Sequence, residues 1–260
     1  MGEFDKFESV GSHRIFGGRF GAAKRRVHNE AYTVFAELLF KYCVADPVKG
    51  PMILYDYFRS SAAYRVRIAI ALKGLVVERR PVHLLRGEQR DPGYRAKSPL
   101  SIVPTLELDD GTLITQSLAI IDYLDALKPD PPLLPQDAVT AAQARAAALT
   151  IACEIHPLAN LRVIEALQGQ FGARDDQIAI WRKRWIYDGL SAVETLIAPA
   201  PFAFGAEPSL ADICLIPQVY NARRFDVPLD ACPRILAVEA ACASHRAFIE
   251  AHPQAQPDAE

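Results

Sequence analysis

The first part of the chain shows short hydrophobic runs separated by polar residues. ILYDY (53–57) is typical of a buried strand, and VVERRPVHL (76–84) predicts a second strand. Pro81 restricts the second strand to a sheet edge or a bulge, because proline donates no ladder hydrogen bond. Between them, the apolar and basic residues of 62–73 favour a helix. The polar stretch 85–98 contains glycine and proline and predicts a loop.

A hairpin and a second helix follow this loop. VPTLEL (103–108) and TLIT (112–115) flank Asp110-Gly111, a dipeptide typical of tight hairpin turns. SLAIIDYLDAL (117–127) repeats its apolar residues every three or four positions, which predicts an amphipathic helix. The expected order is therefore β-α-β-loop-β-β-α, a small α/β unit.

The pattern changes after residue 127. KPDPPLLPQD (128–137) carries four prolines in ten residues and is typical of a linker. Beyond the linker every periodic segment is helical, and the segments that we expect to form helices are 141–149, 175–196, 209–219 and 231–251. We therefore expect an α/β domain over residues 52–130 and an all-α domain over 138–260.

Residues 1–51 show no continuity with these patterns. The chain has two methionines, and the second, Met52, immediately precedes the first predicted strand. Acidic residues near the start argue against a transit peptide, and no secretory hydrophobic segment is visible. Residues 29–44 predict a short amphipathic helix. We interpret residues 1–51 as a leader outside the fold, from a misassigned start or an added sequence, rather than a functional extension.

Composition narrows the class of protein. A formal net charge of −2 gives no general attraction to nucleic acid, and no apolar run reaches the length of a membrane span. The five cysteines are widely spaced and form no C-x-x-C pair, which argues against a disulfide framework and a zinc site. We expect a soluble, reduced, cytoplasmic protein that binds no metal.

Seven motifs in order resemble the zeta class of glutathione transferases over nearly all of the chain from Met52. They are FRSSAAYRVRIAIALKG (58–74), IVPTLEL, QSLAIIDYLD, LLPQD, EIHPLANLRV (154–163), SLADICLIPQVYNARRFDV (209–227) and HPQAQPD (252–258). The resemblance implies a thioredoxin-like α/β N-terminal domain, an all-α C-terminal domain, glutathione as cofactor and a homodimer.

The thiol of glutathione must ionise to act as a nucleophile, and a helix N-terminus with a nearby hydroxyl favours its ionisation. Ser60 and Ser61 lie just before the predicted helix 62–73, and the resemblance places them at the thiol. Helix capping is the simpler role for two serines at this position. The other motifs favour catalysis, and either serine is compatible with the family pattern.

Five more residues match glutathione contacts of the family. Val103 and Pro104 resemble the cis-proline corner that presents backbone groups to the cysteinyl part of glutathione. Gln116 and Ser117 precede the second helix and match the contact with the γ-glutamyl end, where a helix N-terminus suits a carboxylate. Gln89, in the polar loop, is matched to the glycyl end. The structural alternatives are an edge-strand proline and an ordinary helix cap.

Across the linker, the resemblance places His156, Asn160 and Arg162 near glutathione or the dimer partner. Arg162 stands where some relatives have a small hydroxyl residue. Two further departures lie in the opening helix, where Ala62 replaces the family cysteine and Tyr64 replaces a tryptophan. We expect activity to survive the loss of the cysteine, because glutathione supplies the sulfur.

The resemblance implies a second substrate with two carboxylates, which arginine binds well because its planar fork donates two hydrogen bonds. Arg59, beside the serines, and Arg224, in the Asn-Ala-x-Arg-Phe motif, are the candidates. Arg223 stands where many relatives have another residue. Arg65 belongs to the helix motif, and a structural ion pair is the alternative to a role in substrate binding. Solvated surface arginines are the structural alternative.

The implied activity is the cis–trans isomerisation of maleylacetoacetate to fumarylacetoacetate, a step of tyrosine and phenylalanine catabolism. Addition of the thiolate to the double bond, rotation and elimination would return glutathione unchanged. Three alternatives remain: a maleylpyruvate isomerase, a broader transferase acting on α-halo acids, and a non-catalytic interaction module. The Ser60-Ser61-Ala62 sequence favours maleylacetoacetate, since maleylpyruvate isomerases tend to have Ser-Gly-Thr there.

Overall fold

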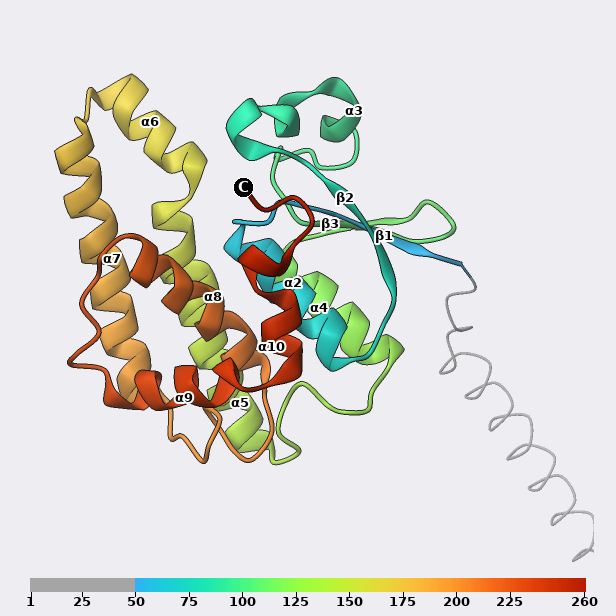
Figure 1. Ribbon diagram of the computed structural model, residues 1–260, viewed down its shortest axis with the longest axis vertical. Coiled ribbons are helices and arrows are strands. Elements are labelled where there is room, and N and C mark those ends of the chain that lie inside the picture. The colour runs from blue at the N-terminus through green and yellow to red at the C-terminus, as the bar shows by residue number, and fades with distance from the viewer. Residues whose placement is uncertain (1–49) are drawn as a thin grey trace, which may run out of the picture. The chain divides into compact units, whose positions relative to one another are not determined.

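The computed structural model describes residues 50–260 and contains a four-stranded sheet (Figure 1). The strands are β1 (Met52–Asp56), β2 (Val77–Pro81), β3 (Thr105–Glu107) and β4 (Leu113–Thr115), in the order β2-β1-β3-β4. β1 and β2 are parallel, and the other two pairs are antiparallel. The proposed leader, including the predicted helix 29–44, lies outside the described residues except for Gly50 and Pro51.

Both faces of the sheet are covered, as the alternation along β1 shows. Met52 and Leu54 belong to the main core, which includes residues of α2 (Ser61–Leu72) and α4 (Ser117–Leu127). Ile53 and Tyr55 point to the opposite face and pack in a smaller cluster with Tyr94 of α3 (Pro92–Arg95). This period of two is the expected result of the strand pleat. The domain is thioredoxin-like, as predicted.

The predicted order of elements in this domain is confirmed, with α4 at the predicted bounds 117–127. Pro81 ends β2, an edge strand, where its missing N–H leaves no gap inside the sheet. The prediction of a plain loop over 85–98 was wrong, because it contains α3 and two 3₁₀ turns, η1 (Leu84–Arg86) and η2 (Glu88–Arg90). Pro92 opens α3, a position that needs no N–H.

The C-terminal domain is helical, as predicted. Its elements are α5 (Ala138–Leu149), a π segment η3 (Thr150–Ile155), a 3₁₀ turn η4 (His156–Ala159), α6 (Leu161–Phe171), α7 (Asp175–Leu196), α8 (Leu210–Arg224), α9 (Pro233–Ala243), α10 (Arg246–Ala251) and η5 (Pro253–Ala255). The predicted single helix 231–251 is two helices, because Ser244 ends α9 and the extended backbone of His245 starts α10. The sequence pattern missed this break.

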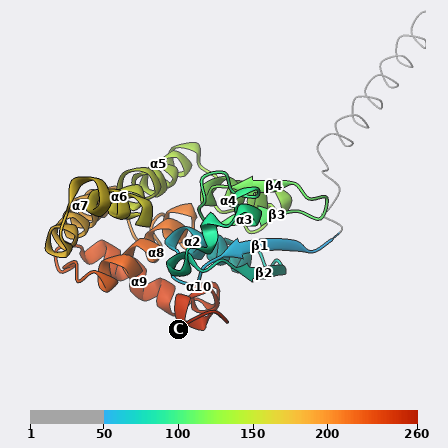
Figure 2. The same cartoon turned by 90° about the horizontal axis from the view of Figure 1, so that it is seen from above.

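α8 connects the two domains, and it packs against both α2 and α5 (Figures 1 and 2). Its N-terminus has the predicted capping box: Asp212 Oδ2 accepts hydrogen bonds from the N–H and the hydroxyl of Ser209, each at 2.8 Å. Asp212 Oδ1 accepts a third from the N–H of Ala203 at 2.8 Å. These bonds satisfy a carboxylate that is fully buried, so they fix the start of a core helix.

One stretch in the described part of the chain, Ala138–Phe171, is long and apolar enough to cross a membrane by length and composition. It is not one regular helix, because η3 and η4 interrupt it. Ile151 and Ile155 in its middle are fully buried in the main core. Length and composition alone are weak evidence for a membrane span, and the buried residues of this stretch pack in the main core.

Candidate functional site

The two serines at the start of α2 have different surroundings. Ser60 is the N-cap residue, and its hydroxyl oxygen accepts a hydrogen bond from the N–H of Ala63 at 3.2 Å. Ser61, the first helical residue, is buried, and its oxygen accepts a hydrogen bond from the side-chain amide of Asn221 at 2.6 Å. Asn221 belongs to α8, so this bond joins the two domains. The sequence did not identify Asn221 as a site residue.

These contacts leave the two serines with different hydrogen-bonding options. The Ser60 oxygen accepts a hydrogen bond from the helix, so its O–H remains available to donate a hydrogen bond to a ligand in the adjoining cavity. Ser60 is also the more accessible of the two. Ser61 is held from the opposite domain by Asn221. Capping and catalysis, which the sequence presented as alternatives, are therefore compatible for Ser60.

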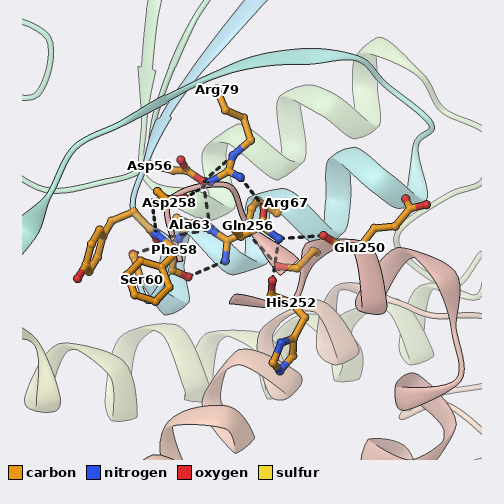
Figure 3. Close-up of polar contacts among 12 residues, drawn as sticks. Asp56, Phe58, Ser60, Ala63, Arg67, Arg79, Glu250, His252, Gln256 and Asp258 are labelled. Carbon is orange, nitrogen blue, oxygen red and sulfur yellow. Dashed lines mark hydrogen bonds and ion pairs between the residues drawn. The ribbon is translucent and has the colours of Figure 1, made fainter. Parts of the chain in front are cut away.

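The segment before Ser60 is held by an ion-pair network that includes the C-terminal tail (Figure 3). The N–H of Phe58 donates to Asp258 Oδ2 at 2.9 Å, and the Phe58 carbonyl accepts from Arg67 Nη2 at 2.9 Å. Both backbone groups of Phe58, which lies outside any regular element, are thus satisfied. The tail residue Asp258 therefore fixes the backbone two residues before the N-cap.

Charges inside this network are balanced by direct contacts. The fully buried Asp56 accepts from Arg67 at 3.1 Å and from Arg79 at 2.6 Å. Arg79 also contacts Asp258 at 3.4 Å and Gln256 (Figure 3). A buried carboxylate with two guanidinium partners tolerates burial that a lone carboxylate would not. The tail motif HPQAQPD thus contributes structure next to Ser60.

Two cavities adjoin the start of α2. The larger has a volume of about 290 Å³ and the smaller about 280 Å³. They share the lining residues Ile102, Val103, His156, Asn160 and Arg162, so they lie side by side between the two domains, and we call the two together the cleft. The larger cavity also contains Arg59, Ser60, Ser61, Gln89 and Arg224, and the smaller contains Ala62, Pro104, Gln116 and Ser117. The structure thus brings together every predicted site residue.

The smaller cavity ends at the N-terminus of α4. Gln116 has a positive φ of 71°, which is strained for a residue with a side chain, and Ser117 begins the helix. Arg65 Nη1 lies 3.4 Å from the Ser117 hydroxyl, while its Nε and Nη2 are buried without a partner. The expected ion pair of Arg65 is absent among the described residues, and Arg67 forms one instead. Burial lowers the pKa of Arg65.

The residues shared by both cavities include a cis peptide bond, a neutral histidine and a helix cap. The Val103–Pro104 peptide bond is cis, as predicted, and β3 pairing starts only at Thr105. Burial, followed by repulsion from a neighbouring arginine, lowers the pKa of His156 to about 3, so its ring is neutral at pH 7. Asn160 is the N-cap of α6, and its side chain accepts from the N–H of Arg162 at 3.2 Å.

Arginines line the larger cavity on the side of Ser60. Arg59 donates to the Tyr57 hydroxyl at 3.2 Å, and its guanidinium lies 5.0 Å from the centre of the Phe58 ring. Arg224 also lines the cavity, whereas Arg223 pairs with Glu239 at 2.7 Å. Arg182 of α7, one of the five arginines in this lining, was missed, because in the sequence it is one of three adjacent basic residues.

Tyr64, the departure from the family tryptophan, is buried and packs edge-on against Tyr220 and His252. The predicted packing role of this aromatic residue is confirmed. Ala62 lines the smaller cavity, and the lining includes one thiol, that of Cys153. Within residues 50–260 no group of three or more His, Cys, Asp and Glu side chains is placed to hold a metal ion.

Comparison with known proteins gives consistent matches. Residues 54–132 match the glutathione S-transferase N-terminal domain, and residues 163–248 match the C-terminal domain. A maleylacetoacetate isomerase from Pseudomonas aeruginosa is 48% identical over 209 residues, which cover 80% of this chain and 98% of that protein.

Solved structures agree with these matches. A holo maleylpyruvate isomerase, described as a bacterial zeta-class glutathione S-transferase, superimposes with a TM-score of 0.77 at 42% identity, covering 80% of this chain and 100% of the other. A maleylacetoacetate isomerase from Anaeromyxobacter dehalogenans, with dicarboxyethyl glutathione and citrate bound in its active site, has a TM-score of 0.73 at 40% identity, covering 81% and 98%.

Proposed function

Because this chain belongs to the zeta class of the glutathione S-transferase family, we propose that it is a glutathione-dependent isomerase converting maleylacetoacetate to fumarylacetoacetate. The observation that carries the proposal is the position of Ser60. One cavity contains its hydroxyl, at the N-terminus of α2, together with Arg59 and Arg224. A site that favours a thiolate beside two cations suits addition to an unsaturated diacid. Such a reaction belongs to tyrosine and phenylalanine catabolism.

The residues of the cleft fit glutathione. Gln89 is buried with its Oε1 unpartnered, and this oxygen can accept a hydrogen bond from the N–H of the glycyl residue. Ser117 and the backbone amides after Gln116 open α4, where a carboxylate of the γ-glutamyl end is favoured. The buried, unpartnered guanidinium nitrogens of Arg65 add positive charge there. The backbone of Val103, outside the β3 ladder, is available to the cysteinyl part.

Bound glutathione supplies a thiolate nucleophile that adds to the cis double bond and is eliminated after rotation. The Ser60 hydroxyl donates a hydrogen bond to that sulfur and so favours its deprotonated form, and the N–H groups of the first turn of α2 contribute their dipoles. Arg59 and Arg224 bind the substrate carboxylates and offset negative charge that develops on the substrate. The neutral His156 adds no charge to the cleft.

The proposal is tested by incubating the purified protein with maleylacetoacetate, with and without glutathione, and following fumarylacetoacetate. Turnover that requires glutathione supports it, and no turnover in either case refutes it. Maleylpyruvate is the second substrate to test, because a maleylpyruvate isomerase is among the similar structures. A higher kcat/KM for maleylpyruvate would assign the chain to that reaction. Conjugation of α-halo acids is a side activity that the same thiolate permits.

We also propose a homodimer in the reducing cytoplasm. Family membership supports the dimer. The reducing compartment is supported by the described cysteines, which are all free thiols: Cys153, Cys214, Cys232 and Cys242. Light scattering should give twice the chain mass of 28.7 kDa. A mass equal to one chain would refute the dimer. The domain boundaries, with residues 1–51 outside the fold, remain predictions, and limited proteolysis followed by mass spectrometry tests them.

A further inference from the structure

Arg182 lies in the second turn of α7 and lines the larger cavity. Its side chain is half-buried, and its Nε is buried without a hydrogen-bond partner. Within the described part of the chain, no acidic residue forms an ion pair with it. Its neighbour Arg184, by contrast, is exposed and lies 3.5 Å from Asp188 on the same helix. Arg182 thus has a donor group, Nε, for which residues 50–260 provide no acceptor.

Phe225 fixes the position of Arg182 relative to Arg224. The guanidinium carbon of Arg182 lies 4.7 Å from the centre of the Phe225 ring, and that of Arg224 lies 4.9 Å from it. Contact with an aromatic ring stabilises a guanidinium and limits its rotation. One ring therefore holds two cations from two helices, α7 and α8, in the same cavity.

The arginines of the cavity repel one another. Burial first and repulsion by Arg224 second lower the pKa of Arg182. Burial first and repulsion by Arg59 second lower the pKa of Arg224. The one acid that lines this cavity, Glu165, contacts Arg90 at 2.5 Å. Among residues 50–260, four of the five arginines in this lining have no ion pair, namely Arg59, Arg162, Arg182 and Arg224. Such a set of cations is stabilised by an anionic ligand with separated charges.

We propose that Arg182 and Arg224, held together by Phe225, bind the substrate carboxylate farther from the double bond, and that Arg182 makes the site select long dicarboxylates. This inference rests on the proposed function and deepens it. Arg59 adjoins Ser60 in the cavity lining, so the near carboxylate binds there. The far carboxylate binds where Arg182 and Arg224 flank the Phe225 ring, because a planar guanidinium donates two hydrogen bonds. Arg182 is then a specificity residue, outside the sequence motifs that identify the family.

The test compares Arg182→Gln with Arg184→Gln, which removes the same charge from an exposed position two residues away on α7. Binding of straight-chain dicarboxylates from malonate to suberate to the glutathione-loaded protein is measured by calorimetry, with hexanoate as the monocarboxylate control. We expect Arg182→Gln to weaken binding of the long diacids at least about tenfold and to leave hexanoate and malonate unchanged. Arg182→Lys should restore part of the loss, since it keeps the charge.

The KM for maleylacetoacetate should rise by a similar factor in Arg182→Gln, while the KM for glutathione stays that of the parent. Equal binding by both variants at every length overturns the inference. A loss that is independent of length, or that extends to glutathione, shows general damage and also overturns it. If the parent binds long diacids through Arg182 but isomerises none, the inference stands and the proposed function fails.

Discussion

Replacing Asp258 by alanine tests the role of the C-terminal tail at the start of α2. The change leaves the N–H of Phe58, a residue 1% exposed, without its acceptor. A buried unsatisfied donor costs about 1–3 kcal/mol, and the partly exposed contact to Arg79 adds less than about 1 kcal/mol. For an m-value of about 2 kcal/mol/M, the urea midpoint should fall by about 0.5–2 M. The KM for glutathione should rise, because Phe58 precedes Ser60 by two residues.

Glu260→Ala is the matched control, since it removes a carboxylate two residues later in the same tail. Glu260 contacts His83 and Arg86, each at 3.1 Å, and is half-exposed, so its loss should cost less than about 1 kcal/mol. The reasoning is wrong if Asp258→Ala and Glu260→Ala shift the midpoint and the KM equally. It is also wrong if Asp258→Ala lowers stability but leaves the KM for glutathione unchanged, because the tail would then not position the site.

Three other predictions concern stability. Burial holds the folded pKa of His156 near 3, below its unfolded value of about 6.5. Between these two values the unfolded state binds more protons, so the free energy of unfolding falls as pH drops from 6.5 toward 3. His156→Gln should reduce this slope in urea midpoints, by at most about 1.4 kcal/mol per pH unit; an unchanged slope contradicts it. Asn221→Ala should lower the free energy of unfolding by about 1–3 kcal/mol, because it removes the hydrogen bond to Ser61. Adding Ser61→Ala should cost little more, and additive losses in a double-mutant cycle would exclude coupling between the two residues. Gly189→Ala should cost about 1–3 kcal/mol in chemical unfolding, because its Cβ would lie 2.3 Å from Ile155 Cγ1; an unchanged midpoint contradicts that packing.

The spacing of apolar residues predicted correctly those helices in which the spacing repeats over several turns. α4 and α7 have the predicted bounds, because their apolar spacing persists over three or more turns. The break between α9 and α10 was missed, because Ser244 and His245 are ordinary helix-compatible residues in sequence. It arises from backbone geometry at two residues, which periodicity does not record. The short turns of 85–98 are likewise too brief to show a period.

The sequence predicted those site residues that lie in recognisable family motifs, and it missed those that only the fold brings to the site. Ser60 and Ser61 were identified together, but their different roles depend on Asn221, which lies 160 residues from Ser61. Asp258 is farther still from Phe58, and only folding brings them together. Arg182 adjoins Lys183 and Arg184, so the sequence offers no reason to choose it.

The pKa of the thiol of bound glutathione tests the central claim most directly, measured from thiolate absorbance across a pH series. The account predicts a value below the ~8.5 of an unperturbed thiol in the parent. It predicts a rise of about 1–2 units in Ser60→Ala, the equivalent of one hydrogen bond to a charged group, and a smaller rise in Ser61→Ala. The account is contradicted if the thiol pKa is the same in the parent and in Ser60→Ala. It is also contradicted if the thiol pKa in the parent equals that of free glutathione.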